Sequence, residues 1–171
     1  MNKKSLWSKI IALSFILAAS CSPAVAGGET GSAAPAWKLH TLDGRLVSST
    51  DFAGKVLVVD FWATWCPPCR AEIPGFVALQ KKYEKEGLVI VGISLDQGGP
   101  DVVKKFIAQN NIGYQIVLAD DGVADAFGGI EGIPTTFVID RAGKIQRKEV
   151  GFVEAAEFEK RIQPLLKAPK S

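Results

Sequence analysis

The sequence predicts an α/β protein with a mixed central β-sheet flanked by helices. First, apolar runs with strand character alternate with segments of helical periodicity through the middle of the chain, which is the pattern of parallel βαβ units. Second, the last two strand-like runs, 135–139 and 144–148, are joined by the turn sequence Asp-Arg-Ala-Gly and so predict an antiparallel hairpin. The 171 residues suffice for one well-buried domain behind a leader.

The first 26 residues have the pattern of a secretory signal peptide. Positive charge precedes an apolar run, 10–19, that is too short to span a bilayer, and a zone of small residues ends at Ala26. Cleavage after Ala26 would leave a soluble protein. Alternatively, Ala18-Ala19-Ser20-Cys21 resembles a bacterial lipobox, in which 1–20 would be removed and Cys21 lipidated. Both routes predict export to the bacterial cell envelope, with membrane attachment only through a lipid anchor.

The positive net charge of the chain comes from its leader. Without Lys3, Lys4 and Lys9, 17 basic and 18 acidic residues remain. This balance leaves no basic patch, so we expect no nucleic-acid partner. Either processing route also removes Cys21 from thiol chemistry, and the exported protein then has two thiols, those of Cys66 and Cys69.

The domain that we expect over 37–168 follows a flexible tether of small residues over 27–36. It begins with a β-hairpin, because an Asp-Gly turn separates two short apolar runs that start at Trp37 and Leu46. The run 56–62 is almost entirely apolar, as in a strand that is covered on both faces.

A helix follows this strand, with apolar residues at helical spacing from Ile73 to Tyr83 and a stop signal at Gly87. The alternation then continues with a buried strand over 88–94 and a helix that Pro100 opens. The remaining expected elements are a strand at 116–118, a short helix at 123–127, the hairpin, and a final helix that carries Phe158, Ile162 and Leu165.

Two cysteines spaced C-x-x-C follow the strand 56–62, as Cys66-Pro67-Pro68-Cys69. A structural disulfide would gain little here, because a loop of two residues constrains the unfolded chain only slightly. A structural zinc site needs four ligands, and the exported chain offers no third cysteine and a single histidine, His40. The pair therefore favours a redox-active disulfide.

The two prolines suit the first turn of a helix, where a missing N–H loses no partner. Cys66 then lies at the helix N-terminus, whose free N–H groups and positive dipole end lower the pKa of a thiol. We expect Cys66 to be the nucleophile and Cys69, one turn further on, to be the shielded resolving thiol.

Asp60 is the one carboxylate in the strand 56–62. A carboxylate held in an apolar layer has a raised pKa and can exchange protons near neutral pH. The alternative is an aspartate at a strand end, solvated by loop water.

The run from Phe61 to Pro74, FWATWCPPCRAEIP, resembles the active-site segment of thioredoxin-fold envelope thiol-disulfide oxidoreductases of the TlpA, ResA and CcmG type. The N-terminal hairpin, the strand-helix stretch around 92–118 and the run GIPTTFVID over 132–140 are similar to that family as well. The resemblance covers about 35–166. It implies a thioredoxin-like fold with an N-terminal β-hairpin and a central strand-helix insertion.

The resemblance also implies roles for single residues. Pro134 would be a cis-proline that faces the dithiol, with exposed backbone at Ile133 to which a client peptide pairs. Asp60 would assist deprotonation of Cys69, although the neighbouring run Val-Gly-Ile lacks the lysine that thioredoxins place there. Glu72 would tune the dithiol and partner recognition; the alternative is a solvated helix charge.

Two residues beside the dithiol complete the expected site. Trp65 shapes its exposed lip, and we expect Trp65 and Pro67 to contact the client. No cofactor beyond the Cys66–Cys69 disulfide is expected.

The function that follows is reduction of specific protein disulfides in the envelope. The resemblance implies clients in cytochrome c maturation or in assembly of oxidase copper sites, with a membrane thiol electron-relay protein as electron donor. Two alternatives remain. A peroxiredoxin-type peroxidase needs a threonine where Ala63 stands, and a Sco-like copper-binding assembly protein needs a wider C-x-x-x-C and a histidine downstream of it.

Overall fold

The structure is a computed structural model that describes residues 28–168. The expected signal peptide and the lipidation candidate Cys21 lie outside the described residues. Over 28–168, no helix is both long enough and apolar enough to cross a membrane.

A five-stranded mixed sheet forms the centre of the fold, in the order β5-β4-β3-β6-β7. Its strands are β3 (Val56–Trp62), β4 (Leu88–Ser94), β5 (Gln115–Leu118), β6 (Thr135–Ile139) and β7 (Ile145–Val150). β3, β4 and β5 run parallel, while β6 and β7 are antiparallel to their neighbours. This topology confirms the predicted mixed α/β sheet, and it puts β3 at the centre.

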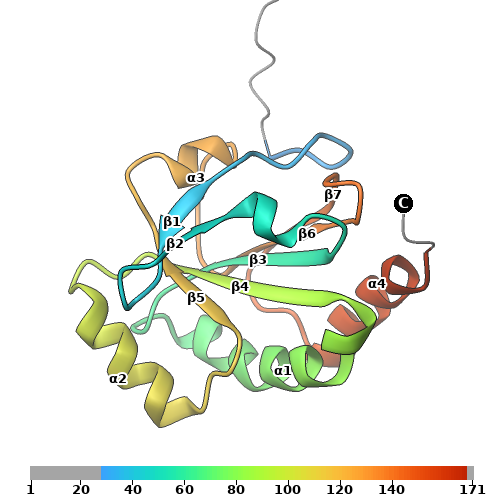
Figure 1. Cartoon of the computed structure of the whole chain (residues 1–171). Helices are drawn as coiled ribbons and strands as arrows, with labels where there is room; N and C mark the ends of the chain where they lie inside the picture. Colours follow the sequence, from blue (N-terminus) through green and yellow to red (C-terminus); the bar gives the residue numbers. More distant parts are fainter. Residues whose placement is uncertain (1–27, 169–171) are drawn as a thin grey trace, which may run out of the picture.

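Helices cover one face of the sheet, and the N-terminal hairpin covers most of the other (Figure 1). On the first face lie α1 (Pro67–Tyr83), α2 (Pro100–Asn110) and α4 (Ala155–Lys167). On the second lie β1 (Lys38–His40), β2 (Leu46–Ser48) and α3 (Val123–Ala126). Two short 3-10 helices, η1 (Ser49–Phe52) and η2 (Glu84–Glu86), connect these elements.

All seven residues of β3 are buried, as its continuous apolar run predicts. Because side chains alternate along a strand, its residues divide between two apolar clusters. Val58 and Trp62 pack in the cluster that also holds Cys66 and Cys69. Asp60 lies between these two residues in the alternation, so its carboxyl group faces the same layer, beneath α1.

The described part of the expected tether 27–36 is docked on the β6–β7 hairpin, which corrects the prediction of a flexible segment. The N–H of Gly31 donates to the carbonyl oxygen of Ile145 at 2.7 Å, and the N–H of Ile145 donates to that of Ser32 at 2.9 Å. A bridge between Ala33 and Lys144 continues this pairing.

The segment can dock because its residues are small. Small residues are also what predicts a flexible tether. Gly28 is buried, and a Cβ atom built on it would lie 2.2 Å from the carbonyl oxygen of Phe127. Glycine therefore allows a close approach of two backbones that a larger residue would prevent.

The final helix needs a smaller correction. Its buried residues are Phe158, Ile162 and Leu166, whereas Leu165 is only partly buried. Positions four apart share one face of a helix, so the stripe that starts at Phe158 reaches Leu166.

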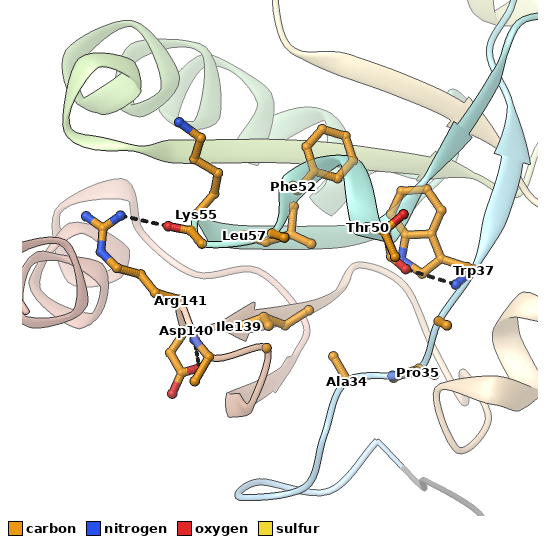
Figure 2. A pocket seen from close by; sticks show the side chains of 16 residues that line it. Ala34, Pro35, Trp37, Thr50, Phe52, Lys55, Leu57, Ile139, Asp140 and Arg141 are labelled. Atoms are coloured by element: carbon orange, nitrogen blue, oxygen red, sulfur yellow. Dashed lines mark hydrogen bonds between the residues drawn. The ribbon is translucent and has the colours of Figure 1, made fainter. Parts of the chain in front are cut away.

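A cavity of about 310 Å³ lies at the other end of the sheet from the two cysteines. Figure 2 shows Trp37, Phe52, Leu57 and Ile139 around it. Leu57 is at the start of β3 and Trp62 at its end, which puts the cavity roughly 16 Å along the strand from the dithiol end. It is therefore separate from the redox site.

Candidate active site

Cys66 and Cys69 form a disulfide at the N-terminus of α1, with Cα atoms 5.3 Å apart. Cys66 is the N-cap residue, and Pro67 occupies the first helical turn. The backbone N–H of Cys69 donates to Sγ of Cys66 at 3.3 Å. In the reduced protein, this donor and the positive end of the helix would both favour a thiolate at Cys66.

Both cysteines are buried in the oxidised protein, Cys66 to 3% and Cys69 to 2% exposure. The sequence predicts that Cys69 is the shielded thiol, but in the oxidised state the two side chains are equally buried. They differ in position, because Sγ of Cys66 accepts the helix N–H and borders the cis-proline loop. Trp65 stands out from the surface at 66% exposure, and Pro67 is exposed as well.

The loop before β6 packs against Cys66. The Ile133–Pro134 peptide bond is cis, as the family resemblance implies. The carbonyl oxygen of Ile133 lies 3.7 Å from Sγ of Cys66, and Ile133 is partly exposed. The carbonyl oxygen of Pro134 accepts a hydrogen bond from the N–H of Gly151 at 2.8 Å. The loop is thus fixed between the dithiol and the segment after β7.

Asp60 is 2% exposed, which excludes the alternative of a carboxylate solvated at a strand end. It lies opposite Gly92 on β4 and Thr136 on β6. The Thr136 hydroxyl donates to Oδ1 of Asp60 at 3.2 Å. Burial raises the pKa of Asp60 well above its usual value, and the nearby charge of Glu72 raises it further.

Glu72 is also buried, at 5% exposure, so it is not a solvated helix charge. The backbone N–H of Val153 donates to its Oε1 at 2.7 Å, while its buried Oε2 has no hydrogen-bond partner among the described residues. Burial raises the pKa of Glu72 from 4.5 to about 7. Glu72 can therefore take up or release a proton near neutral pH.

Two interactions of this site have no signal in the sequence. The partner of Glu72 is a backbone N–H 81 residues away, and backbone groups carry no sequence signature. The second interaction is electrostatic, because the charges of Asp60 and Glu72 act on the buried hydroxyl of Tyr114. Burial raises the pKa of Tyr114 well above its usual value. A tyrosine in a loop before a strand gives no hint of such a position.

The segment between β3 and α1 is held by Asp96. The backbone N–H and the hydroxyl of Thr64 donate to its carboxylate at 2.9 and 2.6 Å, and the Ser94 hydroxyl donates at 2.9 Å. These bonds fix the residues that lead into Cys66. The arrangement as a whole combines an anion-stabilising helix end, a fixed neighbouring loop and two buried acids with raised pKa values.

Several known proteins are similar to this chain. The model of the AhpC/TSA family matches residues 30–148. The chain is 36% identical over 140 residues to the thiol:disulfide interchange protein HelX of Rhodobacter capsulatus, covering 80% of this chain and 76% of that protein. It is 34% identical over 137 residues to the thiol-disulfide oxidoreductase ResA of Geobacillus thermodenitrificans, covering 79% and 77%.

A solved structure is similar to this chain in both fold and sequence. The thiol:disulfide interchange protein of Chlorobium tepidum, a thioredoxin family protein, has a TM-score of 0.73 and 38% identity, with 81% of this chain and 98% of that chain covered. Family match, sequence identity and fold agree with the disulfide at the head of α1. The chain belongs to the AhpC/TSA family and, within it, to the thioredoxin-like thiol-disulfide oxidoreductases of the ResA and CcmG type.

Proposed function

We propose that this protein reduces disulfides of specific client proteins outside the cytoplasm. The observation that carries the proposal is the position of Sγ of Cys66, which accepts the N–H of Cys69 and lies beside the carbonyl oxygen of Ile133. A thiolate is stabilised there, and a client chain along the Ile133–Pro134 loop would meet it. Trp65 and Pro67, both exposed, would contact the client.

The exchange proceeds in two displacements. The thiolate of Cys66 attacks one sulfur of the client disulfide, forming a mixed disulfide and releasing the other client sulfur as a thiolate. Cys69, once deprotonated, attacks Sγ of Cys66, which releases the second client thiolate and closes the Cys66–Cys69 disulfide. Two electrons pass from the dithiol to the client. The proton of Cys69 and one proton from solvent, equal to the one that Cys66 released on ionising, convert the client's two thiolates to thiols.

The two buried acids handle the proton of Cys69. Asp60 lies on the α1 face of β3 and in its carboxylate form would accept that proton. Glu72, whose pKa is about 7, would exchange a proton at physiological pH. Its negative charge, when present, raises the pKa of Asp60. The disulfide itself is the redox group, and no further cofactor takes part.

The site of action is the bacterial cell envelope. The signal-like leader supports export, and its Cys21 would carry a lipid anchor in the lipoprotein route. A membrane protein that relays electrons from thiols on the inner side would restore the dithiol. The clients would be apocytochrome c before haem attachment, or copper-site cysteines during oxidase assembly.

A redox titration tests the direction of electron flow. The protein is equilibrated with glutathione or dithiothreitol buffers, and the fraction of Cys66–Cys69 disulfide is measured by thiol alkylation. A reductant has a potential more negative than about −180 mV, the value of protein disulfide isomerase. A potential near that of DsbA, about −120 mV, would overturn the proposal.

One residue argues against a peroxidase function. Peroxiredoxin-type catalysis places a threonine hydroxyl three residues before the reactive cysteine. Here that residue is Ala63, which is fully buried and offers no hydroxyl. The hydroxyl of the next residue in sequence, Thr64, donates a hydrogen bond to Asp96 instead.

A further inference from the structure

A groove of about 450 Å³ lies between the N-terminal end of α1 and the face of α2. Figure 1 shows α2 next to the beginning of α1. Thr64, two residues before Cys66, and Arg70, next to Cys69, line the groove on one side. Lys105 and Phe106 of α2 line it on the other. A chain that reaches Cys66 over this side of the protein would therefore cross the groove.

The groove carries two cations without a carboxylate partner among residues 28–168. Arg70 and Lys105 are exposed and form no ion pair in this part of the chain. The guanidinium of Arg70 lies over the ring of Phe106, 5.7 Å from its centroid, which holds the charge at the groove.

The neighbouring carboxylates do not neutralise these cations directly. Asp96 accepts hydrogen bonds from Thr64 and from the Ser94 hydroxyl. Asp101 pairs with Lys104 at 3.4 Å. Asp96 keeps its negative charge, but no carboxylate of the described part of the chain lines the groove itself, and the two cations outweigh this one neighbouring charge.

We propose that this groove binds an acidic segment of the client protein close to its disulfide. The inference rests on the proposed function and adds to it a selection of clients by charge. Arg70 is four residues after Cys66, a rise of roughly 6 Å along the helix, which equals about two residues of extended chain. With the length of the side chains, a client carboxylate two to five residues from the attacked cysteine reaches the cations.

The apolar lining of the groove suits the same occupant. Val102 is 46% exposed and lines the groove together with Phe106 and the two cations. A segment with acidic residues around one apolar residue would thus find complementary groups along its length. Gln109 and Asn110 add polar side chains at the rim.

The test uses three disulfide-bonded peptides that differ only in residues flanking the cysteines, which are glutamate, glutamine or lysine. Their rates of reduction by the reduced protein are measured under pseudo-first-order conditions. We expect the glutamate peptide to react several-fold faster than the glutamine peptide, and the lysine peptide more slowly. Raising the salt to about 0.5 M, where the screening length is roughly 4 Å, should remove most of this order.

Variants assign the preference to the groove. Lys105→Gln and Arg70→Gln should each slow the glutamate peptide by about 1.5- to 5-fold, as expected for loss of one partly exposed ion pair. The glutamine peptide should be slowed less than the glutamate peptide, so the ratio of the two rates should fall. Lys105→Glu should shift the preference toward the lysine peptide.

The matched control is Lys104→Gln. Lys104 is next to Lys105 on α2, but it pairs with Asp101 and lines a different cavity, together with Tyr114. Its loss should leave the preference intact. An equal effect of both lysines would show a general charge effect and overturn the proposal, as would equal rates for the three peptides.

A binding measurement separates this inference from the proposed function. The same peptides with serine in place of cysteine are titrated against the oxidised protein by calorimetry. If no peptide is reduced, the proposed function fails, yet tighter binding of the glutamate peptide that Lys105→Gln weakens would still support the groove. Equal binding of all three would overturn it.

Discussion

The backbone N–H of Val153 donates a hydrogen bond to Oε1 of Glu72, across 81 residues of sequence. This bond joins the segment before α4 to the second turn of α1, directly after the disulfide. It also gives a buried carboxylate a fixed orientation, with the second oxygen, Oε2, left without a partner among the described residues. The proton affinity of Glu72 is therefore a property of the tertiary fold.

Replacement of Glu72 by glutamine should change how stability depends on pH. The folded-state pKa, about 7, lies above the ordinary 4.5, so its contribution to stability is fully present below pH 4.5 and is lost as the pH rises through 7. The loss is on the order of 3 kcal/mol. Urea unfolding of the oxidised protein at several pH values should show a shallower decline for Glu72→Gln.

The control for this measurement is Glu84→Gln. Glu84 is exposed and follows α1, so the variant should keep the wild-type decline. Asp60, whose pKa is also raised, remains in both variants and leaves some slope in each. If the free energy of unfolding of Glu72→Gln fell with pH as steeply as that of the wild type, the decline could not be assigned to Glu72.

Asp60→Asn should lengthen the lifetime of the mixed disulfide. Without the buried carboxylate, Cys69 loses the group that accepts its proton, and general acid–base assistance contributes about 10²-fold or more. Stopped-flow measurement with a labelled disulfide peptide separates formation of the mixed disulfide from its resolution. Only the second step should slow down.

The exposed Asp125 offers a comparison for Asp60. Asp125→Asn removes a carboxylate of α3 on the other side of the sheet and should leave both steps unchanged. Equal slowing of formation and resolution in Asp60→Asn would instead point to a damaged fold.

Trapping with Cys69→Ser should capture client proteins. The first displacement occurs at Cys66, and without Cys69 the mixed disulfide cannot be resolved. Non-reducing electrophoresis and mass spectrometry would identify the captured proteins, and acidic residues near the captured cysteine would agree with the groove of Arg70 and Lys105. Capture by Cys66→Ser alone would reverse the roles of the two thiols.

Gly92→Ala should destabilise the core beneath the active site. A Cβ atom at this position would lie 2.7 Å from Cδ1 of Ile116 and 2.8 Å from Nε1 of Trp62. Overpacking of this kind costs about 1–3 kcal/mol. Urea unfolding measures the loss. Gly113→Ala, where nothing lies within 4 Å, should change the free energy of unfolding by far less.

Much of this fold follows from local pattern. The continuous apolar run of β3 predicts its central place, and the same run predicts the burial of Asp60, since a strand covered on both faces leaves no solvated side. Pro67 after Cys66 predicts the helix start. These inferences hold because each depends on neighbours in sequence.

What the sequence does not predict depends on distant contacts. Glu72 is buried because the segment at Val153 closes over it, and helical charges are ordinarily solvated. The docking of Gly28 depends on Phe127, about a hundred residues later in the chain. Small residues are compatible both with a free linker and with close backbone packing, and only the tertiary structure distinguishes the two.

The docked segment shortens the distance by which the domain, with Cys66, can move away from an attachment point before residue 28. Seven extended residues span about 23 Å, and hydrogen bonds to the β6–β7 hairpin remove that length from the reach of the domain. The pivot lies at Gly28, against Phe127, on the face of the sheet that α1 does not cover. A form held at its N-terminus would thus be attached on the face of the sheet opposite α1, the helix that begins after Cys66.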